Sequence, residues 1–322
     1  MLIIKIIIFL FILLYCIRND IIKCHKNKKL KDILLIKRKR EFIKKIIENI
    51  TFVNLISENY RYLINGRITV FANADNSYIK YIPLFCASLL YCDKRNRTDI
   101  EIAIDLNKLP KNIEKALQYL KNIYPQSIIN IRYNAYKLLN KVALFNGKKV
   151  RPNSIRFLIE PKIKNEYIFI GDIDIIYLIE NYYDNYLMNM FNRASCYSNM
   201  VRSYNSSHLS GIHFSKWYCF YPILLPKKIN LMINDEHLLS IRLKQLGVII
   251  DYKTKYRPIF GIHMSVNKPS IKKGYYHWDA LGKKKLWEKF KNTVVFKCIY
   301  PLFDRYIKNK IVLLEDYYKK HK

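Results

Sequence analysis

YIFIGDIDIIY, residues Tyr167–Tyr177, is the segment around which the rest of the chain is organised. An apolar run leads to Gly171, and Asp172 and Asp174 follow with one residue between them. Runs of Ile, Phe and Tyr that end at a turn-forming residue are typical of a buried strand. Two carboxylates at the mouth of a sheet suit a divalent metal ion that carries a phosphorylated ligand. A simple turn also favours Gly and Asp, so the spacing alone leaves both interpretations open.

Strand and helix patterns alternate on both sides of this stretch. Such alternation predicts one α/β domain with a mostly parallel central sheet that helices cover on both faces. Leu209–Phe214 is expected to form a turn, because small residues lie there between apolar ones. The expected strands are Ile68–Ala74, Asp99–Asp105 and Ser127–Arg132. The expected helices are Tyr78–Tyr91 with Ser77 as N-cap, Pro110–Ile123, Asn134–Phe145, Asn153–Ile159, Leu178–Met190 and Leu238–Leu246.

Polar residues follow two of the expected strands at their carboxyl ends. Asn73, Asp75 and Asn76 follow the first strand, and Asp172 and Asp174 follow the central one. In sheets of this kind, ligands bind beyond the carboxyl ends of the strands. The sequence contains no G-x-G-x-x-G, no G-x-x-x-x-G-K-[ST] and no G-x-S-x-G, so dinucleotide, P-loop and serine-hydrolase sites lack their usual motifs.

Four segments differ in composition. Residues 1–17 are hydrophobic and form a candidate membrane anchor, although Leu2–Ile17, which is apolar apart from Lys5, has 16 residues and is shorter than the ~20 that usually span a bilayer. Residues 18–60 form a basic arm that we expect to be helical, residues 61–270 the main domain, and residues 271–322 a basic, aromatic, helical tail. The basic arm predicts that the main domain lies on the cytoplasmic side of a membrane, held beside its anionic surface. A poorly ordered basic arm without membrane binding is the alternative.

The overall charge favours anionic partners. The 322 residues include 57 Lys and Arg against 25 Asp and Glu, a formal net charge of +32. Such a balance suits nucleic acid, acidic phospholipid or phosphate-bearing substrates without choosing among them. The seven cysteines are scattered and form no C-x-x-C pair, which argues against a disulfide framework or a zinc knuckle and for a reducing compartment.

Two later segments carry further polar residues. Asn234, Asp235 and Glu236 precede an expected helix, where such residues are favoured by capping and by the helix dipole alone. His263 follows a short apolar run, and a single histidine is more often a core or surface residue than a ligand.

In their order along the chain, these pieces resemble the family-8 glycosyltransferases, which have a nucleotide-diphospho-sugar transferase (GT-A type) fold. The resemblance covers about residues 68–270. The matching segments are FANADNSY (Phe71–Tyr78), the helix with Arg156, FIGDID (Phe169–Asp174), LSGIHF (Leu209–Phe214), NDEHLLS (Asn234–Ser240) and GIHMSVNKP (Gly261–Pro269).

The resemblance implies a Rossmann-like domain with a role for each motif. Asp172, Asp174 and His263 correspond to the ligands of Mn²⁺ or Mg²⁺, and a set that includes an imidazole suits Mn²⁺ better. Lys268 corresponds to the diphosphate contact. The implied contacts of the nucleotide are Asn73, Asp75, Asn76 and Tyr78, those of the donor sugar are Arg156, Ser210 and Gly211, and the residues implied beside the reacting carbon are Asp235 and Glu236.

The chain also departs from the family pattern. Glu236 stands where the family commonly has Gln, which places a carboxylate where it could act as a nucleophile or stabilise an oxocarbenium-like transition state. Val266 and Ser270 replace a Gly and a Trp of the last motif, and Lys268 comes one residue early. Ser210 stands where an Asn is usual before Gly211.

The resemblance implies a metal-dependent glycosyltransferase of the retaining kind, and the apolar and basic N-terminal residues predict that it is membrane-associated. We expect it to move a hexose from a UDP-linked sugar to a glycan or lipid-linked acceptor in cell-surface polysaccharide or lipopolysaccharide synthesis. Two alternatives remain: an inactive glycosyltransferase-like scaffold, or a basic nucleic-acid-binding protein. The second is disfavoured because the 27 tyrosines lie in apolar runs and form no known nucleic-acid-binding pattern.

Overall fold

The computed structural model describes residues 66–135, 152–192, 196–201, 209–223, 235–245, 261–264 and 281–320. All of these except Gln245 belong to one unit, Ile64–Lys244 with Ile249–Lys322. The candidate anchor and basic arm, most of the helix expected at Asn134–Phe145, Asn234 and Lys268 lie outside the described residues. No helix in the described ranges is long and apolar enough to cross a membrane.

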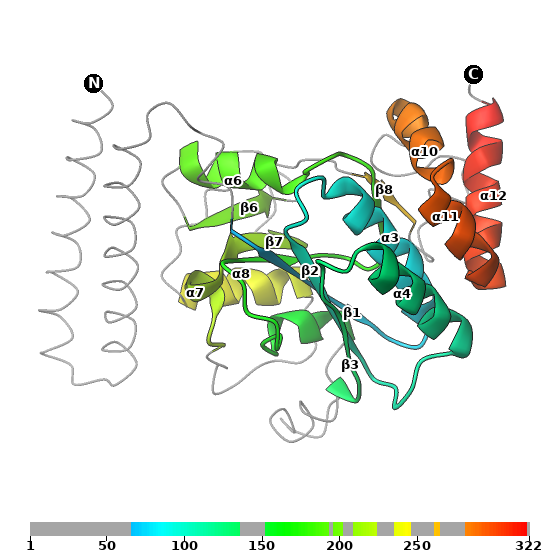
Figure 1. The fold of residues 1–322 in the computed structure, drawn as a ribbon. Helices are drawn as coiled ribbons and strands as arrows, with labels where there is room; N and C mark the ends of the chain where they lie inside the picture. The colour runs from blue at the N-terminus through cyan, green and yellow to red at the C-terminus, as the bar shows by residue number, and fades with distance from the viewer. Residues whose placement is uncertain are drawn as a thin grey trace, which may run out of the picture. The chain divides into compact units, whose positions relative to one another are not determined.

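A six-stranded sheet forms the centre of the described fold (Figure 1). In order across the sheet, the strands are β3 (Ile129–Arg132), β2 (Thr98–Ile104), β1 (Ile68–Ala74), β4 (Tyr167–Ile170), β7 (Leu209–Lys216) and β6 (Tyr197–Val201). The first four run parallel, whereas β7 is antiparallel to β4 and β6 is antiparallel to β7. The predicted α/β fold with a mostly parallel sheet is confirmed.

The stretch Tyr167–Tyr177 divides between two sheets. Its first part is β4, and its last part is β5 (Ile175–Tyr177), which pairs antiparallel with β8 (Gly261–His263) in a separate two-stranded sheet. The strands can approach because Gly261 has no side chain, since a Cβ there would collide with the backbone carbonyl of Ile176. The loop with both aspartates therefore joins the main sheet to the small one.

Helices pack against this framework. The helices before the central strand are η1 (Ile79–Tyr81), α3 (Ile82–Cys92), α4 (Lys111–Ile123) and η2 (Pro152–Phe157). Those after it are α6 (Tyr183–Asn192), α7 (Trp217–Phe220), α8 (Asp235–Gln245), η3 (Leu281–Lys283), α10 (Lys284–Lys291), α11 (Val294–Ile299), η4 (Tyr300–Leu302) and α12 (Arg305–Lys320). Almost every residue of α3 is buried, as expected of a helix that is apolar all round. In α4 only one stripe is buried, with the 3–4 residue spacing of an amphipathic helix.

Residues 281–320 of the C-terminal segment are mostly helical, as predicted, but four of their aromatic side chains belong to the core. In Figure 1, α10–α12 stand beside α3 and α4, and α11 contacts both of these helices. Trp287 and Phe290 are fully buried, and Phe296 and Phe303 are nearly so. They share one hydrophobic cluster with the residues of β1 and α3. These four side chains are therefore not available to a membrane surface.

Three local predictions are corrected. Leu209–Phe214 forms no turn, because hydrogen bonds to β4 and β6 hold it extended within β7. The helix expected from Leu178 begins at Tyr183, because Asn181 has a left-handed backbone (φ 47°) that a helix interior does not accept. Ser77 is not the N-cap. Instead, the carboxylate of Asp75 accepts hydrogen bonds from the backbone N–H groups of Ser77 and Tyr78.

Cysteine pairing is a fourth difference. Cys196 and Cys219 form a disulfide, with 6.3 Å between their Cα atoms. The scattered cysteine pattern gave no sign of this bond, because the two residues come together only when β6 and β7 pair. Cys86, Cys92 and Cys298 are free thiols.

Candidate functional site

The candidate site lies at the carboxyl ends of β1 and β4. These strands are parallel neighbours, so they end at the same edge of the sheet. The backbone N–H of Gly171 donates to the carbonyl of Phe71 at 3.2 Å, which extends the pairing of the two strands by one residue. The aspartate loop thus starts beside the last residues of β1.

Arg156 is the centre of the charges at this edge. It comes from η2 and is 3% exposed. Its Nη1 donates to the carbonyl of Gly171 at 2.7 Å and lies 2.5 Å from Oδ1 of Asp172, and its Nη2 donates to Oδ2 of Asp235 at 2.9 Å. Burial opposes the charge of the guanidinium, but the two carboxylates outweigh it and raise the pKa of Arg156. The structure thus holds a fixed cation between two acidic side chains.

Gly211 forms the wall beside this ion-pair cluster. A Cβ at this position would lie 2.5 Å from Nη2 of Arg156 and 3.3 Å from Oδ2 of Asp235. Any side chain here would therefore displace the guanidinium. Arg156, Asp172, Gly211 and Asp235 are separated in the sequence, and the fold brings them together.

Asp174 and His263 form a second pair. Ile175 of β5 is the register partner of His263 in β8. Nε2 of His263 lies 3.5 Å from Oδ1 of Asp174, and the two residues are 7% and 6% exposed. The backbone N–H of Met264 also donates to the carbonyl of Asp174 at 2.8 Å. The small sheet therefore fixes a carboxylate and an imidazole side by side.

The donor atoms of this pair fit a divalent metal ion such as Mn²⁺, because carboxylate oxygen and imidazole nitrogen are both ligands of that ion. The third predicted ligand, Asp172, has its Oδ1 against Arg156. Among the described residues, no group of three His, Cys, Asp or Glu side chains is placed to hold a metal. The structure thus brings together two of the three predicted ligands.

The residues predicted to contact the nucleotide lie together at the end of β1. Asn73 is buried within the strand, and Asn76 is exposed in the turn after it. Tyr78 is partly exposed and stacks on Tyr81 with 5.7 Å between the ring centroids. Oδ1 of Asp75 accepts hydrogen bonds from the backbone N–H groups of Ser77 and Tyr78, which stabilises the turn before η1.

Two further predicted residues, Glu236 and Ser210, are sequence neighbours of residues in the Arg156 cluster. Glu236 is partly exposed in the first turn of α8, next to Asp235. Ser210 belongs to β7, directly before Gly211. The roles assigned to the candidate site residues stay predictions.

Tyr81 and Tyr177 also lie at the site, but the sequence did not indicate them, because no motif distinguishes them from the other tyrosines among the 27 in the chain. The hydroxyl of Tyr81 donates to the carbonyl of Met264 at 2.8 Å, which ties η1 to the residue after His263. The hydroxyl of Tyr177 is buried, without a hydrogen-bond partner, and lies 3.0 Å from where a Cβ of Gly171 would be. Burial and then the Asp172 carboxylate raise the pKa of Tyr177, so this hydroxyl stays protonated beside the aspartate loop.

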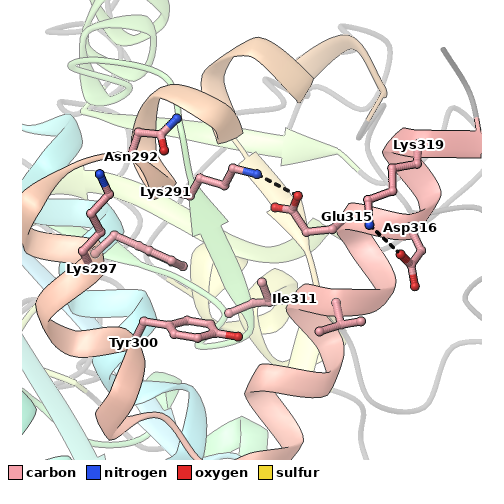
Figure 2. Close-up of a pocket in the computed structure, with 10 residues that line it drawn as sticks. Lys291, Asn292, Lys297, Tyr300, Ile311, Glu315, Asp316 and Lys319 are labelled. Carbon is pink, nitrogen blue, oxygen red and sulfur yellow. Dashed lines mark hydrogen bonds and ion pairs between the residues drawn. The ribbon is translucent and has the colours of Figure 1, made fainter.

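A separate hollow of about 440 Å³ lies among α10, α11 and α12 (Figure 2). Lys291 pairs there with Glu315 at 2.7 Å, and Lys319 pairs with Asp316 at 3.3 Å. None of the candidate site residues lines this hollow. It is therefore a distinct feature of the C-terminal helices.

No protein-family model and no curated protein matches the chain. Solved structures do resemble it in fold. The galactosyltransferase LgtC, in complex with donor and acceptor sugar analogues, has a TM-score of 0.39 at 7% identity, over 75% of this chain and 99% of that one. The mannosyltransferase PcManGT from Pyrobaculum calidifontis, in complex with GDP-Man and Mn²⁺, has a TM-score of 0.36 at 10% identity, over 66% and 62%. GlyE from Streptococcus pneumoniae TIGR4 has a TM-score of 0.31 at 15% identity, over 47% and 34%.

These are all glycosyltransferases. The matched region spans only about a third of the GlyE chain and less than two thirds of PcManGT. The identities are 15% or less and the TM-scores are below 0.4, so no conclusion about this chain is drawn from the likeness. The case for an activity rests on the residues of the site.

Proposed function

We propose that this protein is a metal-dependent glycosyltransferase that moves a hexose from a UDP-linked sugar to a glycan or lipid-linked acceptor. One observation carries the proposal: the aspartate loop after β4 contributes to two charged clusters. In one, Arg156 lies between Asp172 and Asp235, and in the other, Asp174 lies beside His263. We place the reaction in cell-surface polysaccharide or lipopolysaccharide synthesis, as the sequence resemblance suggests.

The reaction breaks the bond between the anomeric carbon and the diphosphate and forms one to an acceptor hydroxyl, which loses its proton. A divalent metal, when bound, would neutralise the charge that develops on the departing diphosphate. Asp174 and His263 are the side chains that would hold it, and Asp172 lies two residues before Asp174 in the sequence.

The Arg156 cluster would orient the sugar. Gly211 leaves open the space beside the guanidinium, where a side chain would otherwise stand. Asp235 is fixed by Arg156, whereas Glu236 is partly exposed beside it. We therefore assign Asp235 a positioning role, and we assign Glu236 the role of the carboxylate that faces the reacting carbon. Retention of the anomeric configuration is part of the proposal and follows from the family resemblance.

Calorimetric titration of UDP tests the proposal. UDP is added to the full chain with Mn²⁺, with EDTA, and to the Asp174→Asn variant with Mn²⁺; GDP is titrated in parallel. Asp316→Asn is the control, because this isosteric change affects an aspartate in the separate hollow. We expect binding that requires both Mn²⁺ and Asp174 and that is unchanged in Asp316→Asn.

Failure of the folded wild-type protein to bind either nucleotide would refute the proposal. Binding that persists in EDTA would refute its metal dependence. If UDP binds but no UDP-sugar is hydrolysed or transferred, the protein is an inactive nucleotide-binding scaffold.

A further inference from the structure

Two lysines from distant parts of the chain meet at one tyrosine ring. Nζ of Lys80 lies 3.8 Å from the ring centroid of Tyr306, and Nζ of Lys310 lies 5.5 Å from it. Lys80 belongs to η1, directly after the residues predicted to contact the nucleotide, whereas Tyr306 and Lys310 belong to α12. The last helix of the chain therefore reaches the β1 end of the candidate site.

A short series of contacts joins this group to the Asp174–His263 pair. The ring of Tyr306 packs edge-on against Tyr81 with 6.2 Å between centroids. Tyr81 donates to the carbonyl of Met264, and the backbone N–H of Met264 donates to Asp174. Burial raises the pKa of Tyr306, and the carboxylate of Asp174 is close enough to raise it further.

Lys310 lies in an environment that disfavours its charged form. Lys310 is 8% exposed, which is rare for a lysine. Burial, and then the charge of Lys80, lower the pKa of Lys310. Within the described ranges, Lys80 makes no ion pair with an acidic side chain. A bound anion that touches both ammonium groups would relieve their repulsion and gain from the low local polarity.

We propose that α12 completes the donor site, with Lys80 and Lys310 contacting the diphosphate of a nucleoside diphosphate and Tyr306 holding the two lysines in place. This inference rests on the function proposed above. It assigns phosphate recognition to a segment beyond the part of the chain that resembles the glycosyltransferase family. The short chain of contacts to Asp174 favours the diphosphate of the donor as the anion.

Calorimetry with UDP and Mn²⁺ on four full-length variants tests the inference. Lys80→Met and Lys310→Met keep the length of the side chain and remove its charge, and Lys310→Arg keeps the charge. Lys308→Met is the matched control, because Lys308 lies on the same helix but its Nζ donates to the carbonyl of Pro301. Thermal unfolding of each variant verifies that it is folded.

We expect Lys80→Met and Lys310→Met each to weaken UDP binding about ten-fold or more. Lys310→Arg and Lys308→Met should change it by less than about three-fold. The UDP affinity of the Met variants should also fall less steeply with added salt, because a contact between charges has been lost. A change in packing alone would leave that salt dependence unaltered.

Two results would overturn the inference, and they differ in meaning. If wild-type and both Met variants bind UDP equally well, α12 has no part in phosphate recognition, and the proposed function stands. If the folded wild-type protein binds neither UDP nor GDP, the proposed function fails and this inference fails with it. Because Lys80 and Lys310 lie on different helices, an unfolded Lys310→Met variant would still leave Lys80→Met to decide.

Discussion

Gly211 is the residue on which the packing of the Arg156 cluster depends. A Cβ there would lie 2.5 Å from Nη2 of Arg156, and the guanidinium cannot move away because Asp172 and Asp235 hold it. We predict that Gly211→Ala lowers the free energy of unfolding by about 1–3 kcal/mol, as overpacking does, and weakens binding of the donor. Urea unfolding and UDP calorimetry measure the two effects.

A double-mutant cycle identifies the cause of that loss. In an Arg156→Lys background the shorter cation leaves room for the methyl group, so Gly211→Ala should cost less there. An equal cost in both backgrounds would show that the clash is not with Arg156.

His213 gives the protein a pH-dependent stability. Its Nε2 lies 3.0 Å from Oγ of Ser215, and burial lowers its pKa from 6.5 to about 3. The folded state therefore excludes a proton that the unfolded chain takes up below its ordinary pKa. The stability that the neutral ring contributes is complete above about pH 6.5 and is lost as pH falls toward the folded-state pKa.

The matching prediction compares wild type with His213→Gln. Between pH 6 and pH 5, wild type should lose about 1 kcal/mol more of its free energy of unfolding than the variant. Urea unfolding at both pH values measures this difference, and His237→Gln, on the partly exposed first turn of α8, is the control. Equal pH dependence of wild type and His213→Gln would contradict the prediction.

The residues of the candidate site were predictable to different degrees. Asp172 and Asp174 stand out as charged residues after an apolar strand, so the sequence pattern makes them candidates, and the family resemblance favours a metal site over a simple turn. Arg156 and Asp235 had to be carried over from a family resemblance, since a single Arg or Asp has no local signature. Tyr81 could not be found at all, because its role depends on a backbone carbonyl that lies far away in the sequence.

Neighbouring residues on α12 test whether the C-terminal helix is part of the core. Leu314 is fully buried, whereas Leu313 beside it is 49% exposed. Leu314→Ala should lower the free energy of unfolding by about 2–5 kcal/mol, and Leu313→Ala should change it by no more than about 0.5 kcal/mol. Urea unfolding measures both variants. Similar small effects would mean that α12 is a loosely attached tail.

Among the secondary-structure elements, β7 was mispredicted for a reason that concerns sheets in general. The sequence LSGIHF has the small residues of a turn, and the conformational preferences of single residues do not show which strands will pair with the segment. Pairing with β4 on one side and β6 on the other supplies the hydrogen bonds that hold the segment extended. By contrast, β1, α3 and α4 were predictable, because strong apolar patterns specify them locally.

For the protein as a whole, the net charge of +32 predicts an electrostatic attraction to anionic membranes. The full chain should co-sediment with vesicles that contain acidic phospholipid, and it should be released as NaCl rises, because salt screens exposed charges. Zwitterionic vesicles serve as the control. Binding that does not respond to salt would contradict this prediction and would point to insertion of an apolar segment.

The alternation of strands and helices, the mostly parallel sheet and the position of the aspartate loop could be predicted from the sequence, because these features follow from apolar periodicity over a few residues. Three features became visible only in the folded structure: β5 leaves the main sheet to pair with β8, Arg156 lies between two carboxylates, and Trp287, Phe290, Phe296 and Phe303 enter the core. These features depend on contacts between residues far apart in the chain. Such contacts form when burial and charge pairing outweigh local preference, and no local pattern records them.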